Sequence, residues 1–276
     1  MNATSRPRPG SRTPLVIDKS FAQAAGARQL QALSTRFDFW VPSAFYYEVF
    51  DTEAVKRRAT LCGFKGFRRV DLAATLRKEA ETGEPVHEID LRHLEFNPDL
   101  LSIDWKLKPA ESAILLQYKR AVVDPLISFW GNVIDKGVIG FSAGELAAAR
   151  GTEAEFVVLC EKLRSCDRIR EIAKEIGFRH ASVLNESWLQ YRKLQTWILQ
   201  GLVLSRRHRT SGDMRNQERI EHDVHDIEYL TLGLYVGRLA TAETSRKFSN
   251  ASMEWRFKLL APTGMLLTPE SLKTVL

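Results

Sequence analysis

The sequence has no long apolar run and very few cysteines. A membrane-spanning helix needs about 20 consecutive apolar residues, and no segment of this 276-residue chain reaches that length. The three cysteines (Cys62, Cys160 and Cys166) are an odd number, and they lack the paired spacing of a zinc site. These absences predict a protein without a membrane span, whose thiols are reduced as in the cytoplasm.

Two other common signals are also missing. The chain has no glycine-rich phosphate-binding loop of either common type, and no Cys/His arrangement suits a thiol enzyme. Residues 1–13 are polar and basic and lack the apolar centre of a secretory signal, so we expect a flexible basic tail there. The remaining residues, 14–276, are expected to form one domain.

What the sequence does have is an excess of basic residues. Lysine and arginine total 40 against 34 aspartate and glutamate, which makes the formal charge +6. A basic balance favours polyanionic partners and raises the rate at which they are encountered. Charge alone therefore favours a polyanionic partner, of which RNA and DNA are two.

The first part of the chain alternates between strand and helix patterns. Residues 14–18 and 37–41 are short, apolar and rich in β-branched or aromatic side chains, which predicts two buried strands. Helices are expected over residues 21–35 and 42–50, the second with Pro42 in its first turn. This alternation is typical of an α/β sheet.

The middle of the chain has a different pattern. Residues 57–215 are dominated by helical periodicity, and helices are expected at 111–134, 153–176 and 182–204. The strand and helix alternation then returns, with an expected helix at 226–237 and expected strands at 238–241, 258–261 and 265–267. The sheet would therefore be built from both ends of the chain, with a helical insertion at about 57–215.

Four acidic residues lie where these expected elements begin or end. Asp18 closes the first strand, Glu48 is the single charge in an apolar helix, Asp226 opens a helix and Glu243 follows a strand. The carboxyl ends of parallel strands form the crevice in which α/β proteins bind ligands. A buried carboxylate without a partner is costly, and carboxylate oxygens suit Mg²⁺ or Mn²⁺. The combination predicts a metal site that activates water for attack on phosphate.

Each acid taken alone has another interpretation. Asp18 can cap the following helix, and Glu48 can pair with an arginine of the insertion. Asp226 can interact favourably with its helix dipole, and Glu243 can be a solvated loop residue. The metal site therefore depends on all four acids together.

The order and spacing of the acids resemble the PIN and PIN-like domain family. In that family the first strand ends in Asp before a small or hydroxyl residue, as in Val16-Ile-Asp18-Lys-Ser20. The second acid is a helical Glu after a Pro-started segment, as in Pro42 to Glu48. The third acid opens a helix about seventeen residues before a strand that ends in Thr-x-Asp. Here the strand ends in Thr241-Ala-Glu243, and 243 − 226 = 17. The resemblance covers roughly residues 14–55 and 218–272.

The resemblance implies a three-layer α/β/α sandwich with a central parallel sheet. It also implies an Mg²⁺- or Mn²⁺-dependent endoribonuclease. Asp18, Glu48 and Asp226 would be catalytic metal ligands, and Glu243 would be an outer ligand. The side chains expected to orient them are Ser20, Thr241 and Asp223.

Two positions depart from the family pattern. Lys19 stands where a small polar residue is common, and we expect its ammonium to point outward as a phosphate contact or a solvated charge. Glu243 replaces the usual Asp. Some PIN-like proteins lack activity, so a catalytically weak RNA- or protein-binding module is the alternative function. A toxin-like role with an antitoxin or other protein partner stays open at this point, as does homo-oligomerisation.

Two further motifs have alternative interpretations. The segment from Glu221 to Asp226 packs two histidines and three acids into six residues, which suits a transition-metal site or exposed residues at a helix start. The loop-like run around residues 205–209 is either a phosphate clamp or a solvated connector. The side chains expected to contact nucleic acid are Lys19, Arg206, Arg207 and Arg209.

Overall fold

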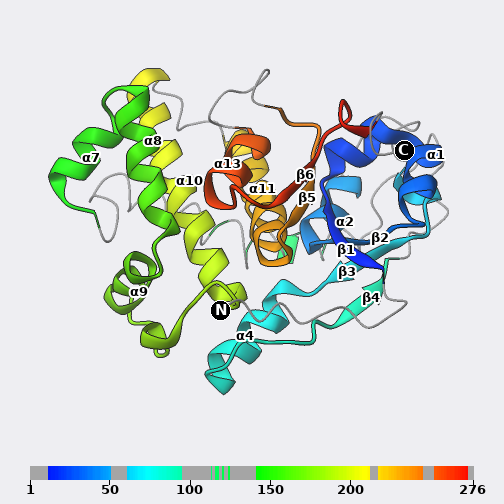
Figure 1. Cartoon of the computed structure of the whole chain (residues 1–276), viewed down its shortest axis with the longest axis horizontal. Coiled ribbons are helices and arrows are strands. Elements are labelled where there is room, and N and C mark those ends of the chain that lie inside the picture. The colour runs from blue at the N-terminus through cyan, green and yellow to red at the C-terminus, as the bar shows by residue number, and fades with distance from the viewer. Residues whose placement is uncertain are drawn as a thin grey trace.

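The computed structural model describes most of the chain, namely residues 12–50, 61–94, 141–211, 217–244 and 252–272 and positions 113, 116, 117, 120 and 124. Most of the helix expected at 111–134 lies outside these residues, as do the first eleven residues of the expected tail. The described residues form an α/β fold around a six-stranded sheet (Figure 1).

The strands follow the order β4-β3-β2-β1-β5-β6. Their bounds are β1 (Thr13–Ile17), β2 (Phe37–Val41), β3 (Phe67–Val70), β4 (Leu91–His93), β5 (Arg238–Ala240) and β6 (Met265–Leu267). Neighbours run parallel except β3 and β4, which are antiparallel. The expectation of a parallel sheet is therefore wrong at one edge, and the sheet is mixed.

The strand order reverses at β1. The chain runs outward through β2 and β3 on one side of β1, and later returns to build β5 and β6 on the other side. Val16 pairs with Leu239 and Ile17 pairs with Ala240, so β1 and β5 end side by side. The residues that follow these two strands therefore meet at a topological switch point, the usual ligand site of such sheets.

Helices surround the sheet and extend the molecule to one side. They are α1 (Lys19–Leu33), α2 (Ser43–Phe50), α4 (Leu72–Thr82), α7 (Ala143–Ala149), α8 (Glu153–Glu161), α9 (Cys166–Glu175), α10 (Leu189–Ser211), α11 (Gln217–Val236) and α13 (Met253–Leu260). Short 3-10 turns occur at η3 (Lys162–Arg164) and η4 (Ala181–Val183). Polar side chains start several helices in the expected way, and Asp71 and Ser252 each accept a backbone N–H of the first turn.

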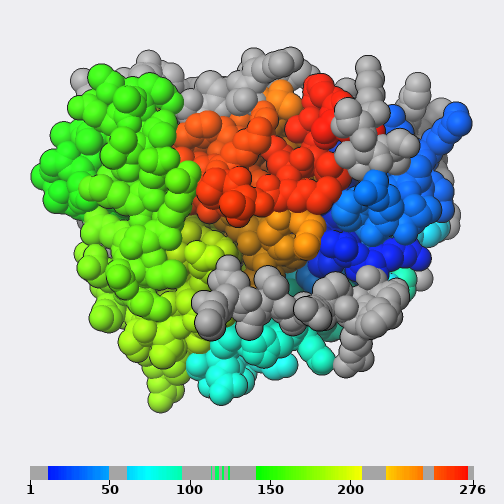
Figure 2. All heavy atoms as spheres, viewed as in Figure 1, coloured from blue at the N-terminus to red at the C-terminus, as the bar shows by residue number. Residues whose placement is uncertain are grey.

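One apolar core links the sheet to the helices. Leu15, Val16 and Ile17 of β1 are fully buried in it, as are Tyr191 of α10 and Leu232 of α11. Helix α11 packs on β1 and β5 as well as on α10 and α13. Helices α7, α8 and α9 lie at one side of the molecule and strands β1–β4 at the other (Figure 1). Helix α13 lies between these two groups on the visible surface (Figure 2).

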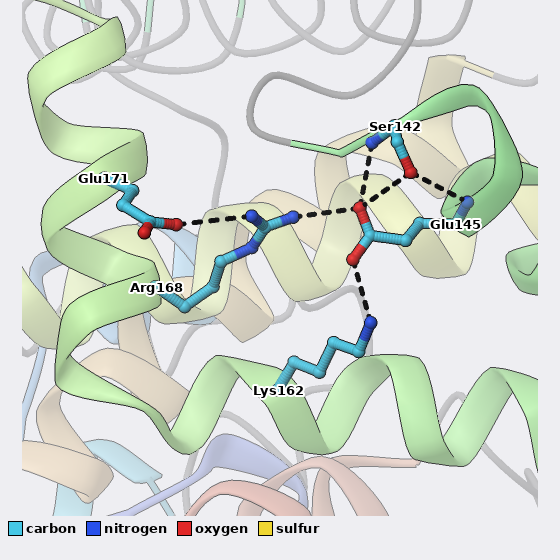
Figure 3. Close-up of polar contacts among 5 residues, drawn as sticks. All are labelled: Ser142, Glu145, Lys162, Arg168 and Glu171. Carbon is cyan, nitrogen blue, oxygen red and sulfur yellow. Dashed lines mark hydrogen bonds and ion pairs between the residues drawn. The ribbon is translucent and has the colours of Figure 1, made fainter.

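A charged network ties α7, η3 and α9 together (Figure 3). Glu145 accepts from the backbone N–H of Ser142 at 2.9 Å and from the ammonium of Lys162 at 2.8 Å. Arg168 reaches the same carboxylate at 3.1 Å and Glu171 at 3.4 Å. The hydrogen bond from Lys162 is the largest influence that lowers the pKa of Glu145, to about 2. The carboxylate thus joins three helical segments in its ionised form.

Several sequence expectations fail in this fold. The stretch 57–215 is not wholly helical, because it supplies β3 and β4; both strands are short and carry charged residues, which hides their pattern. The helix expected at 153–176 breaks at Ser165, which caps α9. Residues 258–261 are not a strand but largely the end of α13, since Ser252 starts a helix there.

Candidate metal centre

The four predicted acids lie near enough for their charges to affect one another, although they belong to different elements. Among the described residues, the ligand atoms found within 4.8 Å of one another belong to Glu48, His222 and His225, so the structure does not bring Asp18, Asp226 and Glu243 into one such group. Asp18 follows β1, Glu48 lies on α2, Asp226 lies on α11 and Glu243 follows β5. Their charges repel one another: Asp18 raises the pKa of Glu48, Asp226 and Glu243, and Glu243 raises that of Asp226. The expectation that Asp226 opens a helix is wrong, because α11 begins at Gln217 and Asp226 lies inside it.

Asp18 is held by hydroxyl groups from both sides of the switch point. It is 5% exposed, and its side chain accepts from the Ser20 backbone N–H at 3.1 Å, from the Ser20 hydroxyl and from the Thr241 hydroxyl at 2.7 Å. Burial raises its pKa, and these hydrogen bonds oppose that rise. The Ser20 hydroxyl also accepts from the backbone N–H of Ala242, and the Thr241 hydroxyl accepts from that of Glu243. Asp18 therefore caps α1 and faces the acid cluster at the same time.

Glu48 is oriented by helix α11. The Tyr229 hydroxyl donates to its Oε2 at 2.5 Å, and the Ala44 backbone N–H donates to Glu228 at 2.9 Å, which fixes the start of α2 against α11. Burial raises the pKa of Glu48 to about 7. The ammonium of Lys19 lies 3.6 Å from Oε1 and its side chain is 21% exposed. The expectation that Lys19 points outward is therefore wrong, because the buried carboxylate draws the ammonium inward.

Asp226 faces a buried arginine that the sequence did not indicate. Arg256 of α13 is 1% exposed, and its guanidinium lies 3.9 Å from Asp226 and 3.6 Å from Asp223. Burial raises the pKa of Asp226 well above its usual range, repulsion from Glu243 adds to this, and Arg256 opposes it. Asp223, expected to support the metal ligands, has Arg256 as its ion-pair partner.

Glu243, which follows β5, lies beside the start of α13, where its backbone carbonyl accepts from the Glu254 N–H at 3.2 Å. Its carboxylate accepts a hydrogen bond from the backbone N–H of Met253, the first residue of that helix. Burial raises its pKa to about 7, and the nearby Asp18 contributes to the rise. The longer side chain of Glu, in place of the Asp of the resembled family, thus still reaches the cluster.

The cluster holds more negative than positive charge. Five acidic side chains meet there (Asp18, Glu48, Asp223, Asp226 and Glu243), and the ion pairs described above bring in two cations, Lys19 and Arg256. With every acid ionised and His225 neutral, these groups leave 5 − 2 = 3 negative charges. Buried carboxylates in such excess must bind protons or a cation. Their oxygen atoms are the ligands that hard divalent cations prefer, so the residues fit Mg²⁺ or Mn²⁺.

Two histidines of α11 lie beside this cluster. The Nδ1 atom of His225 is 4.0 Å from Oε1 of Glu48. One ligand atom each of Glu48, His222 and His225 lie within 4.8 Å of one another, an arrangement that can hold a metal ion. Both histidines lie within α11 and not at its start, so that part of the interpretation is wrong. His222 is exposed as expected, whereas the side chain of His225 is 15% exposed.

The basic run at 205–209 lies in a helix and not in a loop. Arg206, on α10, donates to Glu153 at 2.9 Å and to the carbonyl of Thr152 at 3.2 Å, and its guanidinium lies 4.7 Å from the centroid of the Phe156 ring. These contacts fasten α10 to α8. The side chains of Arg207 and Arg209 lie outside the described part of the structure.

In comparisons with protein-family models, curated proteins and solved structures, no match to this chain is found. None of the helices in the described ranges combines the length and apolar character needed to cross a bilayer.

Proposed function

We propose that this protein is a divalent-metal-dependent nuclease of PIN-like type that hydrolyses RNA phosphodiester bonds. The observation that supports the proposal is that four buried or partly buried acids, from four separate elements near the switch point of the sheet, influence one another's charge. The proposal includes a three-layer α/β/α arrangement of PIN-like type. The basic charge of the chain, +6, favours a polyanionic substrate.

The proposed roles are those that the resemblance to PIN-like domains implies. Asp18, Glu48 and Asp226 would hold Mg²⁺ or Mn²⁺, with Glu243 as an outer ligand. When bound, the ion would supply an activated water and neutralise charge on the phosphate.

The surrounding side chains prepare these ligands. Thr241 and Ser20 fix the carboxylate of Asp18, and Tyr229 fixes that of Glu48. Arg256 offsets the repulsion between Asp226 and its acidic neighbours. Such supporting contacts set the direction of metal ligands and commonly change metal affinity 10–100-fold. Lys19 pairs with Glu48 and keeps part of its side chain exposed, so in this proposal its ammonium would turn from Glu48 to a phosphate group when RNA binds.

The test is cleavage of labelled RNA by the purified chain, with Mn²⁺ and with EDTA. Asp18→Asn should abolish Mn²⁺-dependent cleavage, because an amide is a weaker metal ligand but keeps the helix cap of α1. The matched control is Asp167→Asn on α9, whose carboxylate is exposed and pairs only with Arg170 among the described contacts. Cleavage by Asp18→Asn at the wild-type rate would refute the assignment. A parallel DNA substrate shows which nucleic acid is cut.

The two cations in the cluster favour a second candidate function, a catalytically weak RNA-binding module. Lys19 and Arg256 already neutralise part of the acidic charge. The repulsion among the acids in the absence of metal is therefore weaker than it would be without these two cations. This candidate expects salt-sensitive RNA binding that survives EDTA and the Glu243→Gln substitution. A gel-shift series over salt concentration, with no cleavage in Mn²⁺, would favour it over the nuclease.

A further inference from the structure

Helix α11 presents polar side chains in two different directions. Asp223 and Asp226 face Arg256 on α13. His225 and Tyr229 face Glu48 on α2. The first direction contains a buried guanidinium that offsets acidic charge. The second contains two imidazoles, which the proposed nuclease does not use, and the carboxylate of Glu48, which it does.

The geometry of the second direction suits one metal ion. His222 and His225 are three positions apart on a helix, which places them on the same face. Their ligand atoms and one oxygen of Glu48 lie within 4.8 Å of one another. Metal–ligand bonds of about 2.0–2.2 Å require ligand atoms roughly 3–4 Å apart, so small side-chain rotations suffice.

The contacts of Glu48 leave one of its carboxylate oxygens facing the histidines. Tyr229 donates to Oε2, and Oε1 is the atom that faces His225 at 4.0 Å. His222 is exposed, so water can complete the coordination of an ion there. The ammonium of Lys19, 3.6 Å from the same Oε1, would have to move aside, and its partial exposure gives it a path to solvent.

We propose that Glu48, His222 and His225 form a metal site that selects a divalent transition-metal ion over Mg²⁺. Imidazole nitrogen suits ions such as Zn²⁺ and Co²⁺, whereas Mg²⁺ prefers oxygen ligands and keeps its waters. The site differs from the carboxylate cluster in its donor atoms and shares only Glu48 with it. The inference goes beyond the proposed nuclease, because it concerns metal selection and holds whether or not RNA is cut.

The test uses the full chain, stripped with EDTA and titrated with Co²⁺, Zn²⁺ and Mg²⁺. Co²⁺ should develop the visible absorption of a site with nitrogen ligands, and calorimetry should find Zn²⁺ bound at least about tenfold more tightly than Mg²⁺. His222→Gln and His225→Gln should each weaken Co²⁺ and Zn²⁺ binding by about tenfold or more, since even supporting residues of metal sites change affinity this much.

A matched histidine provides the control. His180 contacts the carbonyl of Ala80 and is partly exposed, and His180→Gln should leave Co²⁺ binding unchanged. Because His222 is exposed, its substitution should keep the wild-type circular dichroism spectrum. Wild-type Co²⁺ affinity in both His222→Gln and His225→Gln, or equal affinity of the wild type for Zn²⁺ and Mg²⁺, would overturn the proposal.

Asp226→Asn separates this proposal from the nuclease. The variant should keep its Co²⁺ spectrum and lose metal-dependent RNA cleavage if both proposals hold. Retained cleavage together with a histidine-dependent Co²⁺ spectrum would refute the role of Asp226 in the nuclease and leave the histidine site standing. Loss of the Co²⁺ spectrum in Asp226→Asn would count against the histidine site.

Discussion

Replacing Arg256 with methionine should destabilise the protein by about 3 kcal/mol. Removing one partner of a buried ion pair costs about 3–5 kcal/mol, because the other charge stays buried without compensation. Arg256 is 1% exposed and faces Asp223 at 3.6 Å and Asp226 at 3.9 Å. Both distances exceed a good hydrogen bond, so the lower end of that range applies. Methionine fills much of the same volume, which keeps the cavity contribution small.

The measurement is urea unfolding followed by circular dichroism, with Arg92→Met as the control. Arg92 pairs with Asp90 at 3.0 Å on the surface, where its side chain is 60% exposed. Its substitution should change the free energy of unfolding by no more than about 0.5 kcal/mol. If Arg256→Met also changes stability by this little, the cluster does not depend on its buried cation and the reasoning fails.

A double substitution tests the electrostatic cause directly. Arg256→Met combined with Asp226→Asn should be more stable than Arg256→Met alone, because the second change removes one uncompensated charge. The expected coupling is about 1–3 kcal/mol, as for neighbouring buried groups. Additive losses would show that Arg256 acts through packing instead.

Mn²⁺ at about 100 times its dissociation constant should raise the free energy of unfolding by about 2.7 kcal/mol in any variant that binds the ion only in its folded state.

Three further predictions concern other contacts. Tyr229→Phe removes the donor to Glu48 and should weaken Mn²⁺ binding about 10–100-fold by calorimetry while the fold persists; unchanged affinity would contradict the orienting role. Lys162 helps to lower the pKa of Glu145 to about 2. The ionised carboxylate therefore contributes fully to the free energy of unfolding above its unfolded pKa of 4.5, and this contribution is lost as pH falls toward 2. Wild type should therefore lose about 1 kcal/mol more than Glu145→Gln in acid, after allowance for partial exposure, and parallel acid-unfolding curves would disprove this. Thr196→Val removes the hydroxyl that lies 2.7 Å from the buried hydroxyl of Thr231 on α11. The loss should lower the free energy of unfolding by about 1–3 kcal/mol, measured by thermal unfolding. A variant with the wild-type Tm would show that this hydrogen bond does not stabilise the fold.

Local pattern was enough to predict the parts of the fold nearest the candidate site. The buried run before Asp18 and the alternating run at 37–41 became β1 and β2, and the apolar segments at 238–241 and 265–267 became β5 and β6. These strands are apolar enough for their burial to be readable from residue type alone. The acids that follow β1 and β5 were accordingly found at the edge of the sheet.

Other elements depended on contacts that no local pattern contains. Strand β3 is Phe-Arg-Arg-Val and β4 is Leu-Arg-His, and such short, charged segments become strands only because a sheet edge is available to pair with. The run at 258–261 has the composition of a strand, but it continues a helix that the cap at Ser252 starts. Tertiary context overrides propensity in each case.

The sequence by itself determined which acids are available and that two of them follow strands. Only the tertiary structure decided what surrounds them: Tyr229 and Lys19 on Glu48, Arg256 on Asp226, and the histidines of α11 turned toward α2. These partners come from elements far apart in the chain, and burial sets the strength of each interaction between them. The charge balance of the site is therefore a property of the packed molecule, because residue type alone does not reveal which buried charges will face one another.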